Sequence, residues 1–263
     1  MIMDLLDGKK PLIGMVHCLP LLNTPGFKNN MEEVIKRAVT DAKTLEEAGM
    51  HAIIVENMGD GPLGIKLDFE QQISLAVVTA VVKQNVNIPV GIDAAFNDYK
   101  AALAIAKSTG AEFVRIPVFV DTVVNHLGIV TPCAREAVYY RKSINAEEVK
   151  IFGDIQVKHS RMLMKDVPIE ESGHMAEAMG ADGIIITGIS TGFETPIDLI
   201  DRVKKHVKIP VIAGSGVDTK NVGTQMSHVD GAIVGSSLKE NKDLSNPIKK
   251  ELVDALLKAY RGE

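Results

Sequence analysis

The 263-residue sequence contains no tryptophan, and aromatic residues make up only 4% of it. Proteins that stack on nucleic-acid bases need aromatic platforms, and those that bind the phosphate backbone need clustered basic charge. Here 34 acidic residues outnumber 29 basic ones, and no long basic run is present. The composition therefore argues against a nucleic-acid partner.

Cysteine is also scarce, with Cys18 and Cys133 alone. Two cysteines make no disulfide framework, so we expect a reducing compartment and a cytoplasmic protein. No window of about 18 uninterrupted apolar residues occurs, so no membrane span is predicted. Residues 1–10 include acidic side chains and lack the apolar core of a secretory signal. We interpret them as an N-terminal extension.

Familiar cofactor and metal motifs are missing too. No G-x-G-x-x-G follows the first apolar run, which counts against a dinucleotide-binding fold. No H-x-H, H-E-x-x-H or C-x-x-C spacing indicates a metal site. The sequence therefore predicts no particular cofactor. A divalent metal is still possible, because the carboxylates described below could bind one.

What the sequence does contain is eight short runs rich in valine and isoleucine. Their near-continuous apolar character is typical of parallel strands buried on both faces. Segments with apolar residues at three- and four-residue spacing lie between them and are typical of helices. The predicted strands are residues 11–17, 51–57, 88–93, 112–117, 149–155, 182–187, 209–213 and 230–234. The predicted helices are residues 30–48, 68–83, 98–108, 134–143, 169–179, 196–206, 219–226 and 247–260.

Eight strand–helix units without a linker predict an α/β fold, a single (β/α)₈ TIM barrel over residues 1–263. A doubly wound open sheet is the alternative. Gly49, Gly110 and Gly180 each end a predicted helix before a small residue and a strand. This repeated phrase fits a half-barrel duplication, or simply the common needs of helix-to-strand loops. Barrels of this size often self-associate, so we expect a homo-oligomer.

Two glycine–serine segments follow the last two predicted strands. In TIM barrels these loops frequently bind phosphate, because glycine lets the backbone approach an anion and successive N–H groups cradle it. Small residues also simply permit tight turns, but the two segments together favour an anion. The predicted phosphate-binding residues, with the serine hydroxyls as further donors, are Gly214, Ser215, Gly216, Gly235, Ser236 and Ser237.

Carboxylates stand at or near the ends of other predicted strands, where barrel enzymes carry their catalytic groups. Crowded carboxylates shift one another's pKa values and so yield an acid and a base. Glu56 is the strongest candidate, because it directly ends an apolar strand where an unpaired charge is costly. Asp60 and Asp93 also fit structural roles in turns. The predicted catalytic carboxylates are Glu56, Asp60, Asp93 and Asp154.

Basic side chains near the same strand ends complete the candidate site. Lys158 fits a Schiff-base nucleophile, a ligand for an anionic substrate, or an ion-pair partner. Arg115 lies inside an apolar strand, so we expect Glu56 or Asp93 to pair with it, for substrate binding or for structure. His17 fits an acid/base, a metal ligand or a core histidine. Lys158 and His17 join the predicted catalytic set, and the predicted substrate-binding residues are Asn57, Arg115, His159, Thr187 and Gly188.

Several longer segments resemble the BtpA/SgcQ family. The resemblance runs from about residue 10 to residue 250, and its motifs are specific as an ordered set. They are residues 13–17 (IGMVH), 19–20 (LP), 54–57 (IVEN), 59–60 (GD), 89–92 (PVGI), 97–98 (ND), 113–115 (FVR), 157–159 (VKH), 191–192 (TG), 214–217 (GSGV) and 231–239 (GAIVGSSLK).

This resemblance implies a TIM barrel of the phosphate-binding type. The family is named for a role in photosystem I biogenesis in cyanobacteria, and one relative belongs to a sugar-metabolism setting. It implies no settled activity. The sequence departs from the family pattern at residues 94–96 (AAF), where an Asn-Val-Leu-Arg-like segment is common, and at Pro117, where Asn is usual. Fewer polar side chains there would alter or remove an activity.

Three functions fit these observations. The first, which we favour, is an isomerase, epimerase or lyase (aldolase) that acts on a small phosphorylated, sugar-like metabolite through carboxylate acid/base chemistry. The second is a non-catalytic assembly or stability factor of the photosystem I biogenesis type, which requires an exposed apolar patch. The third is a barrel that binds a nucleoside or nucleotide.

Overall fold

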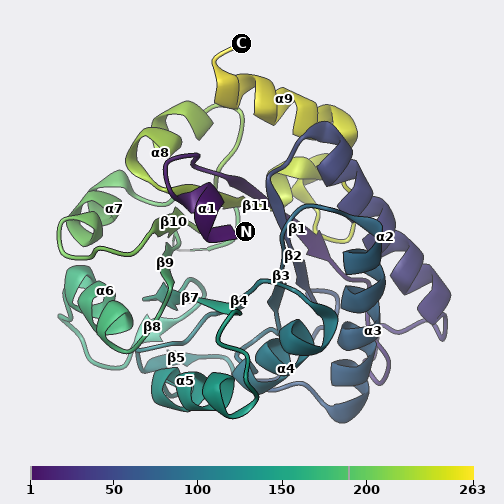
Figure 1. The fold of residues 1–263 in the computed structure, drawn as a ribbon, viewed down its shortest axis with the longest axis horizontal. Coiled ribbons are helices and arrows are strands. Elements are labelled where there is room, and N and C mark those ends of the chain that lie inside the picture. Colours follow the sequence, from purple (N-terminus) through teal and green to yellow (C-terminus); the bar gives the residue numbers. More distant parts are fainter. Residues whose placement is uncertain (1, 189) are drawn as a thin grey trace.

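A computed structural model describes residues 2–188 and 190–263 and shows a closed barrel of eight parallel strands (Figure 1). Each strand pairs with the next barrel strand along the chain, and the last pairs with the first. The TIM-barrel prediction is confirmed, and the open-sheet alternative is wrong because the sheet has no edge. The strands are β1 (Leu12–His17), β2 (Ala52–Glu56), β3 (Val90–Asp93), β4 (Phe113–Ile116), β7 (Lys150–Ile155), β9 (Gly183–Ile186), β10 (Val211–Ala213) and β11 (Gly231–Val234).

Eight helices alternate with these strands and surround the barrel (Figure 1). All eight predicted helices are present, with bounds that differ by a few residues. Gly49, Gly110 and Gly180 adopt positive φ angles of 102°, 74° and 92° where their helices end, as expected. The helices are α2 (Met31–Ala48), α3 (Phe69–Asn85), α4 (Tyr99–Thr109), α5 (Ala134–Ser143), α6 (Ile169–Ala178), α7 (Ile197–Lys204), α8 (Val222–His228) and α9 (Lys250–Arg261). Within the described residues, none of the helices is both long and apolar enough to cross a membrane.

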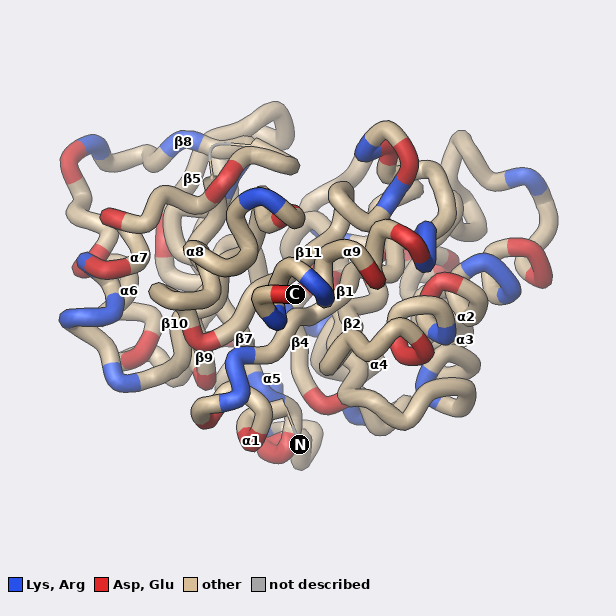
Figure 2. Tube along the Cα trace, turned by 90° about the horizontal axis from the view of Figure 1, so that it is seen from above, with Lys and Arg blue, Asp and Glu red and all other residues tan. Residues whose placement is uncertain are grey.

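The structure adds short elements at the two ends of the barrel. Helix α1 (Ile2–Leu6) lies at one end, and a three-stranded sheet of β5 (Val123–Asn125), β6 (Gly128–Val130) and β8 (Arg161–Met162) lies at the other (Figure 2). Ile2 and Leu6 are buried in the same apolar cluster as the barrel interior. The N-terminal extension thus packs on the barrel core through these two side chains.

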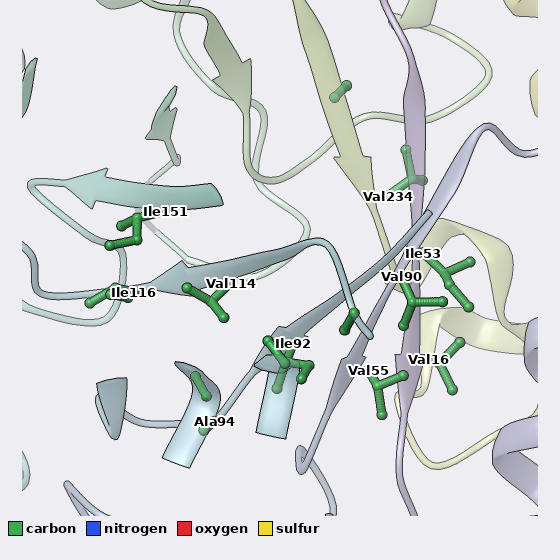
Figure 3. Packing of buried hydrophobic residues seen from close by; sticks show 14 of the residues in the cluster. Val16, Ile53, Val55, Val90, Ile92, Ala94, Val114, Ile116, Ile151 and Val234 are labelled. Carbon is green, nitrogen blue, oxygen red and sulfur yellow. The ribbon is translucent and has the colours of Figure 1, made fainter. Parts of the chain in front are cut away.

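Alternating side chains of each strand point into the barrel and toward the helices. Val90, Ile92 and Val114 face the helices and pack in the larger apolar cluster (Figure 3). Phe113 and Phe152 fill the interior, with ring centroids 5.1 Å apart. Glycines on neighbouring strands make room for these rings: a Cβ on Gly91 would lie 2.2 Å from Phe113, and one on Gly183 would lie 2.9 Å from Phe152. Side chains therefore fill the barrel interior below the strand ends, and a ligand is expected at the C-terminal end of the barrel.

Candidate active site

Four charged or ionisable side chains form one row across four neighbouring strands. His17 is in register with Glu56, Glu56 with Asp93, and Asp93 with Arg115. Each lies at or near the C-terminal end of its strand, and all four are buried. We call these four residues the charged row. Residues predicted separately from four strand ends thus come together in one layer.

A cavity of about 320 Å³ opens above the charged row. This volume lies within the range of small-molecule sites. Its opposite wall comes from the loops after β9, β10 and β11, whose residues are small. The described residues lining it are Met15, His17, Glu56, Met58, Leu63, Asp93, Ala95, Phe96, Arg115, Pro117, Asn125, His126, Val157, Lys158, His159, Thr191, Gly192, Gly214, Ser215, Gly216, Val217, Ile233, Val234, Gly235, Ser236, Ser237 and Leu244.

Arg115 is fixed by a bidentate ion pair with Asp154. Its Nε and Nη2 donate to the two Asp154 oxygens at 2.8 and 2.7 Å, and its Nη1 lies 3.7 Å from Asp93 Oδ2. Burial lowers the pKa of Arg115, but the charge and hydrogen bonds of Asp154 raise it further, so the guanidinium stays charged. The expected pairing with Asp93 is therefore present at 3.7 Å, and the bidentate partner, Asp154, was not predicted. Asp154 lies outside the described residues that line the cavity, and both of its oxygens bind Arg115.

Glu56 is held as a carboxylate by the positive groups around it. Burial raises its pKa, but the hydrogen bond and charge of His17, together with Arg115 and Lys158, lower it below the usual glutamate value. His17 Nε2 lies 3.4 Å from Glu56 Oε2. Among the described residues, His17 Nδ1 is buried and has no hydrogen-bond partner.

The pKa of Asp93, on the neighbouring strand, is shifted in the opposite direction from that of Glu56. Burial and the adjacent Glu56 charge raise the pKa of Asp93 well above the usual aspartate value, and Arg115 offsets this only in part. In the described part of the chain its Oδ1 has no hydrogen-bond partner. Two neighbouring carboxyl groups with pKa values pushed in opposite directions are typical of an acid/base pair.

We expect the Asp93→Asn variant to be more stable than the original protein at neutral pH. A raised folded-state pKa contributes stability that is complete below about pH 3.8, the unfolded value, and is lost as pH rises through the folded value. The amide removes this loss, so its advantage in the free energy of unfolding should grow as the pH rises. Urea unfolding at several pH values measures it. A variant that is less stable by the same amount at every pH would contradict the raised pKa.

Lys158 and His159 follow β7 in a loop with unusual backbone geometry. Gln156 and His159, on either side of Lys158, have positive φ angles of 46° and 60°, although neither is glycine. Such strain costs about 1–3 kcal/mol per residue and gathers at active sites. Burial and the nearby Arg115 charge lower the pKa of Lys158. His159 Nε2 accepts a 3.2 Å hydrogen bond from the Thr191 N–H and lies 2.9 Å from Thr191 Oγ1.

The glycine–serine loops line the cavity, but two of their hydroxyls are already engaged. Ser215 Oγ donates to Phe193 O at 2.9 Å, and Ser237 Oγ donates to Val217 O at 2.8 Å. Because a hydroxyl has one proton to donate, these two would have to give up these contacts in order to donate to a ligand. Ser236 faces Gly192 across the cavity. The loop backbone and Ser236 remain as candidate anion ligands.

Packing explains two of these glycines without any ligand. A Cβ on Gly214 would lie 2.4 Å from Ile185 Cγ2. Gly216 has φ of 72°, and its Cβ would lie 2.2 Å from the backbone of residues 193 and 194. A Cβ on Gly235 would instead meet Met15 and His17 at about 3.3 Å, inside the cavity wall. Gly235 is thus the glycine whose small size most directly shapes the cavity.

Asp60 and Asn57 lie outside the described residues that line the cavity, and they hold loops together instead. Asp60 accepts hydrogen bonds from Leu21 N, Asn57 Nδ2 and Gln71 Nε2 at 2.7, 3.1 and 2.8 Å. Asn57 Oδ1 accepts one from Ala95 N at 2.8 Å. Asp60 and Asn57, predicted as catalytic and ligand-binding residues, thus join the loops after β1, β2 and β3 through these hydrogen bonds.

Thr187 and Gly188 line a groove beside the cavity, which Lys158 and His159 also reach. Thr187 Oγ1 accepts a 2.9 Å hydrogen bond from Lys158 N, and Gly188 N donates to Ser215 Oγ. Sequence reasoning missed Asn125 and His126, which reach the cavity from the β5–β6 hairpin. That hairpin is inserted between β4 and α5, and the strand–helix alternation of the sequence does not predict it.

A metal site finds no further support in the described ranges 2–188 and 190–263. They contain no group of three or more His, Cys, Asp or Glu side chains placed to hold an ion. Arg115 already occupies the oxygens of Asp154, and His17 lies beside Glu56.

Sequence comparison connects the chain to one family. The profile of the BtpA family matches residues 8–262. A protein of Pyrococcus abyssi is 37% identical over 265 residues, which cover 99% of this chain and 100% of that one. The photosystem I biogenesis protein BtpA of Synechocystis is 34% identical, over 95% of this chain and 87% of its own length.

Comparison with solved structures gives TIM-barrel enzymes. The thiamine phosphate pyrophosphorylase of Pyrococcus furiosus has a TM-score of 0.63 at 16% identity, with 98% of each chain covered. The (S)-3-O-geranylgeranylglyceryl phosphate synthase of Thermoplasma acidophilum, solved with its substrate sn-glycerol-1-phosphate, has a TM-score of 0.64 at 15% identity. The alignment covers 100% of this chain and 97% of that one. At such identities the likeness shows the fold alone.

Proposed function

This chain belongs to the BtpA family, and we propose that it is an enzyme of the isomerase, epimerase or lyase type that acts on a small phosphorylated, sugar-like metabolite. One observation carries the proposal. Glu56 and Asp93, in register on adjacent strands, have pKa values displaced in opposite directions beside a cavity lined on its far side by glycine–serine loops.

The two carboxyl groups divide the acid/base work. Glu56 is ionised, so its Oε atoms accept a proton from a substrate carbon or hydroxyl. The raised pKa favours the protonated form of Asp93, and its carboxyl, whose Oδ1 has no hydrogen-bond partner among the described residues, donates a hydrogen bond or a proton to a substrate oxygen. Arg115 stays bound to Asp154 and supplies fixed positive charge that stabilises developing negative charge.

The phosphate would bind on the opposite wall. There the loops at residues 214–216 and 235–237 bring backbone and the Ser236 hydroxyl to the cavity, with no carboxylate among the lining residues of that wall that the structure describes. A net charge of −5 for the whole chain does not oppose anion binding, since the described lining residues of this wall include no carboxylate.

Phosphorylated compounds should therefore raise the melting temperature of the protein. At a ligand concentration of about 100 times Kd the linkage contributes about 2.7 kcal/mol, which is a rise of several degrees for a chain of this size. Differential scanning fluorimetry with sugar phosphates, triose phosphates and nucleotides measures the shift. Ser236→Asp should abolish it by repulsion, whereas the matched change Ser227→Asp, on the exposed face of α8, should keep it.

No shift with any phosphorylated compound would refute the proposal. A shift confined to compounds that carry a nucleobase would favour the alternative of a nucleotide-binding barrel. The screen should be repeated with divalent metals, since a metal that couples to the phosphate would appear as a larger shift in its presence.

An assembly factor is the second candidate, because α3 exposes an apolar stripe. Phe69, Ile73 and Val77 follow one another at four-residue spacing and are 71%, 47% and 42% exposed. A relative also carries the name of a photosystem I biogenesis protein. Under this reading the host function would survive Glu56→Gln and fail when the stripe is made polar by Ile73→Ser.

A further inference from the structure

The acid/base pair leaves open the role of the Lys158 amine, which lines the cavity. It enters the cavity from the loop after β7. Within the described residues this amine makes no hydrogen bond and no ion pair, although Glu56, Asp93 and Asp154 are near enough to influence its charge. Asp154 is saturated by Arg115, and Glu56 lies against His17. A half-buried amine that its neighbours do not engage is available to a ligand.

The loop holds Lys158 in place by contacts on both sides. Its own N–H donates to Thr187 Oγ1, and Gln156 N donates to Asp121 Oδ2 at 2.7 Å. His159 is tied to Thr191. The left-handed φ angles of Gln156 and His159 are therefore imposed by the surrounding structure. Strain of this kind persists where it places a functional side chain.

We propose that Lys158 is a nucleophile that forms an imine with a carbonyl carbon of the phosphorylated substrate. This rests on the proposed function and narrows its substrate class to phosphorylated ketones and aldehydes. An amine attacks a carbonyl only when unprotonated. Burial and the positive charge of Arg115 lower the pKa of Lys158 and so favour that form.

Asp93 is placed to complete the condensation. The Lys158 nitrogen bonds to the carbonyl carbon, and the carbonyl oxygen leaves as water with one proton from that nitrogen and one from the Asp93 carboxyl. The products are a protonated imine, water and the Asp93 carboxylate, so atoms and charge balance without oxidation or reduction. The imine draws electrons from the adjacent carbon, and Glu56 can then remove a proton from that carbon or from a neighbouring hydroxyl.

The test traps the imine with sodium borohydride. Dihydroxyacetone phosphate should leave a reduced, covalent adduct on Lys158, found by intact mass and peptide mapping. Glycerol phosphate, which lacks the carbonyl, should raise the melting temperature and leave no adduct. Lys158→Arg keeps the positive charge and should keep the thermal shift, but both it and Lys158→Met should lose the adduct. Lys205→Met, an exposed lysine, should label like the original protein.

The outcomes separate this inference from the proposed function. If carbonyl phosphates raise the melting temperature but none labels Lys158, the imine is refuted and the phosphate-binding enzyme stands. The imine is also refuted if Lys158→Met labels as the original protein does, or if Lys158→Arg turns over substrate normally. If no phosphorylated compound binds, both proposals fall.

Discussion

Replacing Arg115 with methionine should lower the free energy of unfolding by about 3–5 kcal/mol, the usual cost of removing one partner from a buried ion pair. The guanidinium makes two hydrogen bonds of 2.8 and 2.7 Å to Asp154, which is 1% exposed. Without Arg115 that carboxylate keeps its desolvation penalty and loses its compensation. Urea unfolding with circular dichroism measures the change.

Two further variants show whether the ion pair itself is responsible. The double change Arg115→Met with Asp154→Leu should recover much of the lost stability, because no buried charge is then left alone. Lys107→Met, which breaks the exposed pair with Glu148, should leave the unfolding curve nearly unchanged. A mild Arg115→Met phenotype, with no recovery in the double variant, would show that Asp154 is neutral or hydrated.

Replacing Glu56 with glutamine should reduce turnover of the substrate found by the thermal screen by roughly 100- to 10,000-fold, the usual contribution of a general base. Glutamine keeps the shape and can still hydrogen-bond to His17, so the fold and the thermal shift should persist. Glu171→Gln, on an exposed part of α6, is the matched control. Turnover by Glu56→Gln within a few-fold of the original would exclude Glu56 as the base.

The pH dependence of turnover should reflect the same pair. The pKa of Glu56 lies below its ordinary value of 4.5, so the base stays ionised down to unusually acid pH. The pKa of Asp93 lies well above 3.8, so activity should fall as pH rises through it and the acid loses its proton. Asp93→Asn should remove that alkaline decline together with most of the rate. Because Glu56 and Asp93 interact, the two apparent pKa values of the pH–rate profile belong to the pair and not to either residue alone.

The barrel and the level of its site could be predicted because both follow from short-range patterns. Apolar strands buried on two faces have a clear signature, and parallel strands place their C-terminal ends at one end of a barrel. His17, Glu56, Asp93 and Arg115 could therefore be assigned to the same end of the barrel before their contacts were known. Family membership was likewise accessible, since it depends on ordered motifs along most of the chain.

Only the tertiary structure decided which of these side chains meet. Arg115 pairs with Asp154 because the stagger of the strands brings Asp154 to its guanidinium, a relation that no sequence spacing encodes. Asp60 lies in a loop, where its carboxylate accepts hydrogen bonds from Leu21 and Gln71 and does not line the cavity. Helix α1 is too short to form alone and exists because the barrel buries Ile2 and Leu6. The apolar side chains that fill the barrel interior, two phenylalanines among them, follow from the sequence pattern of the strands. The contacts among the charged side chains at the C-terminal strand ends depend on how the strands and loops pack.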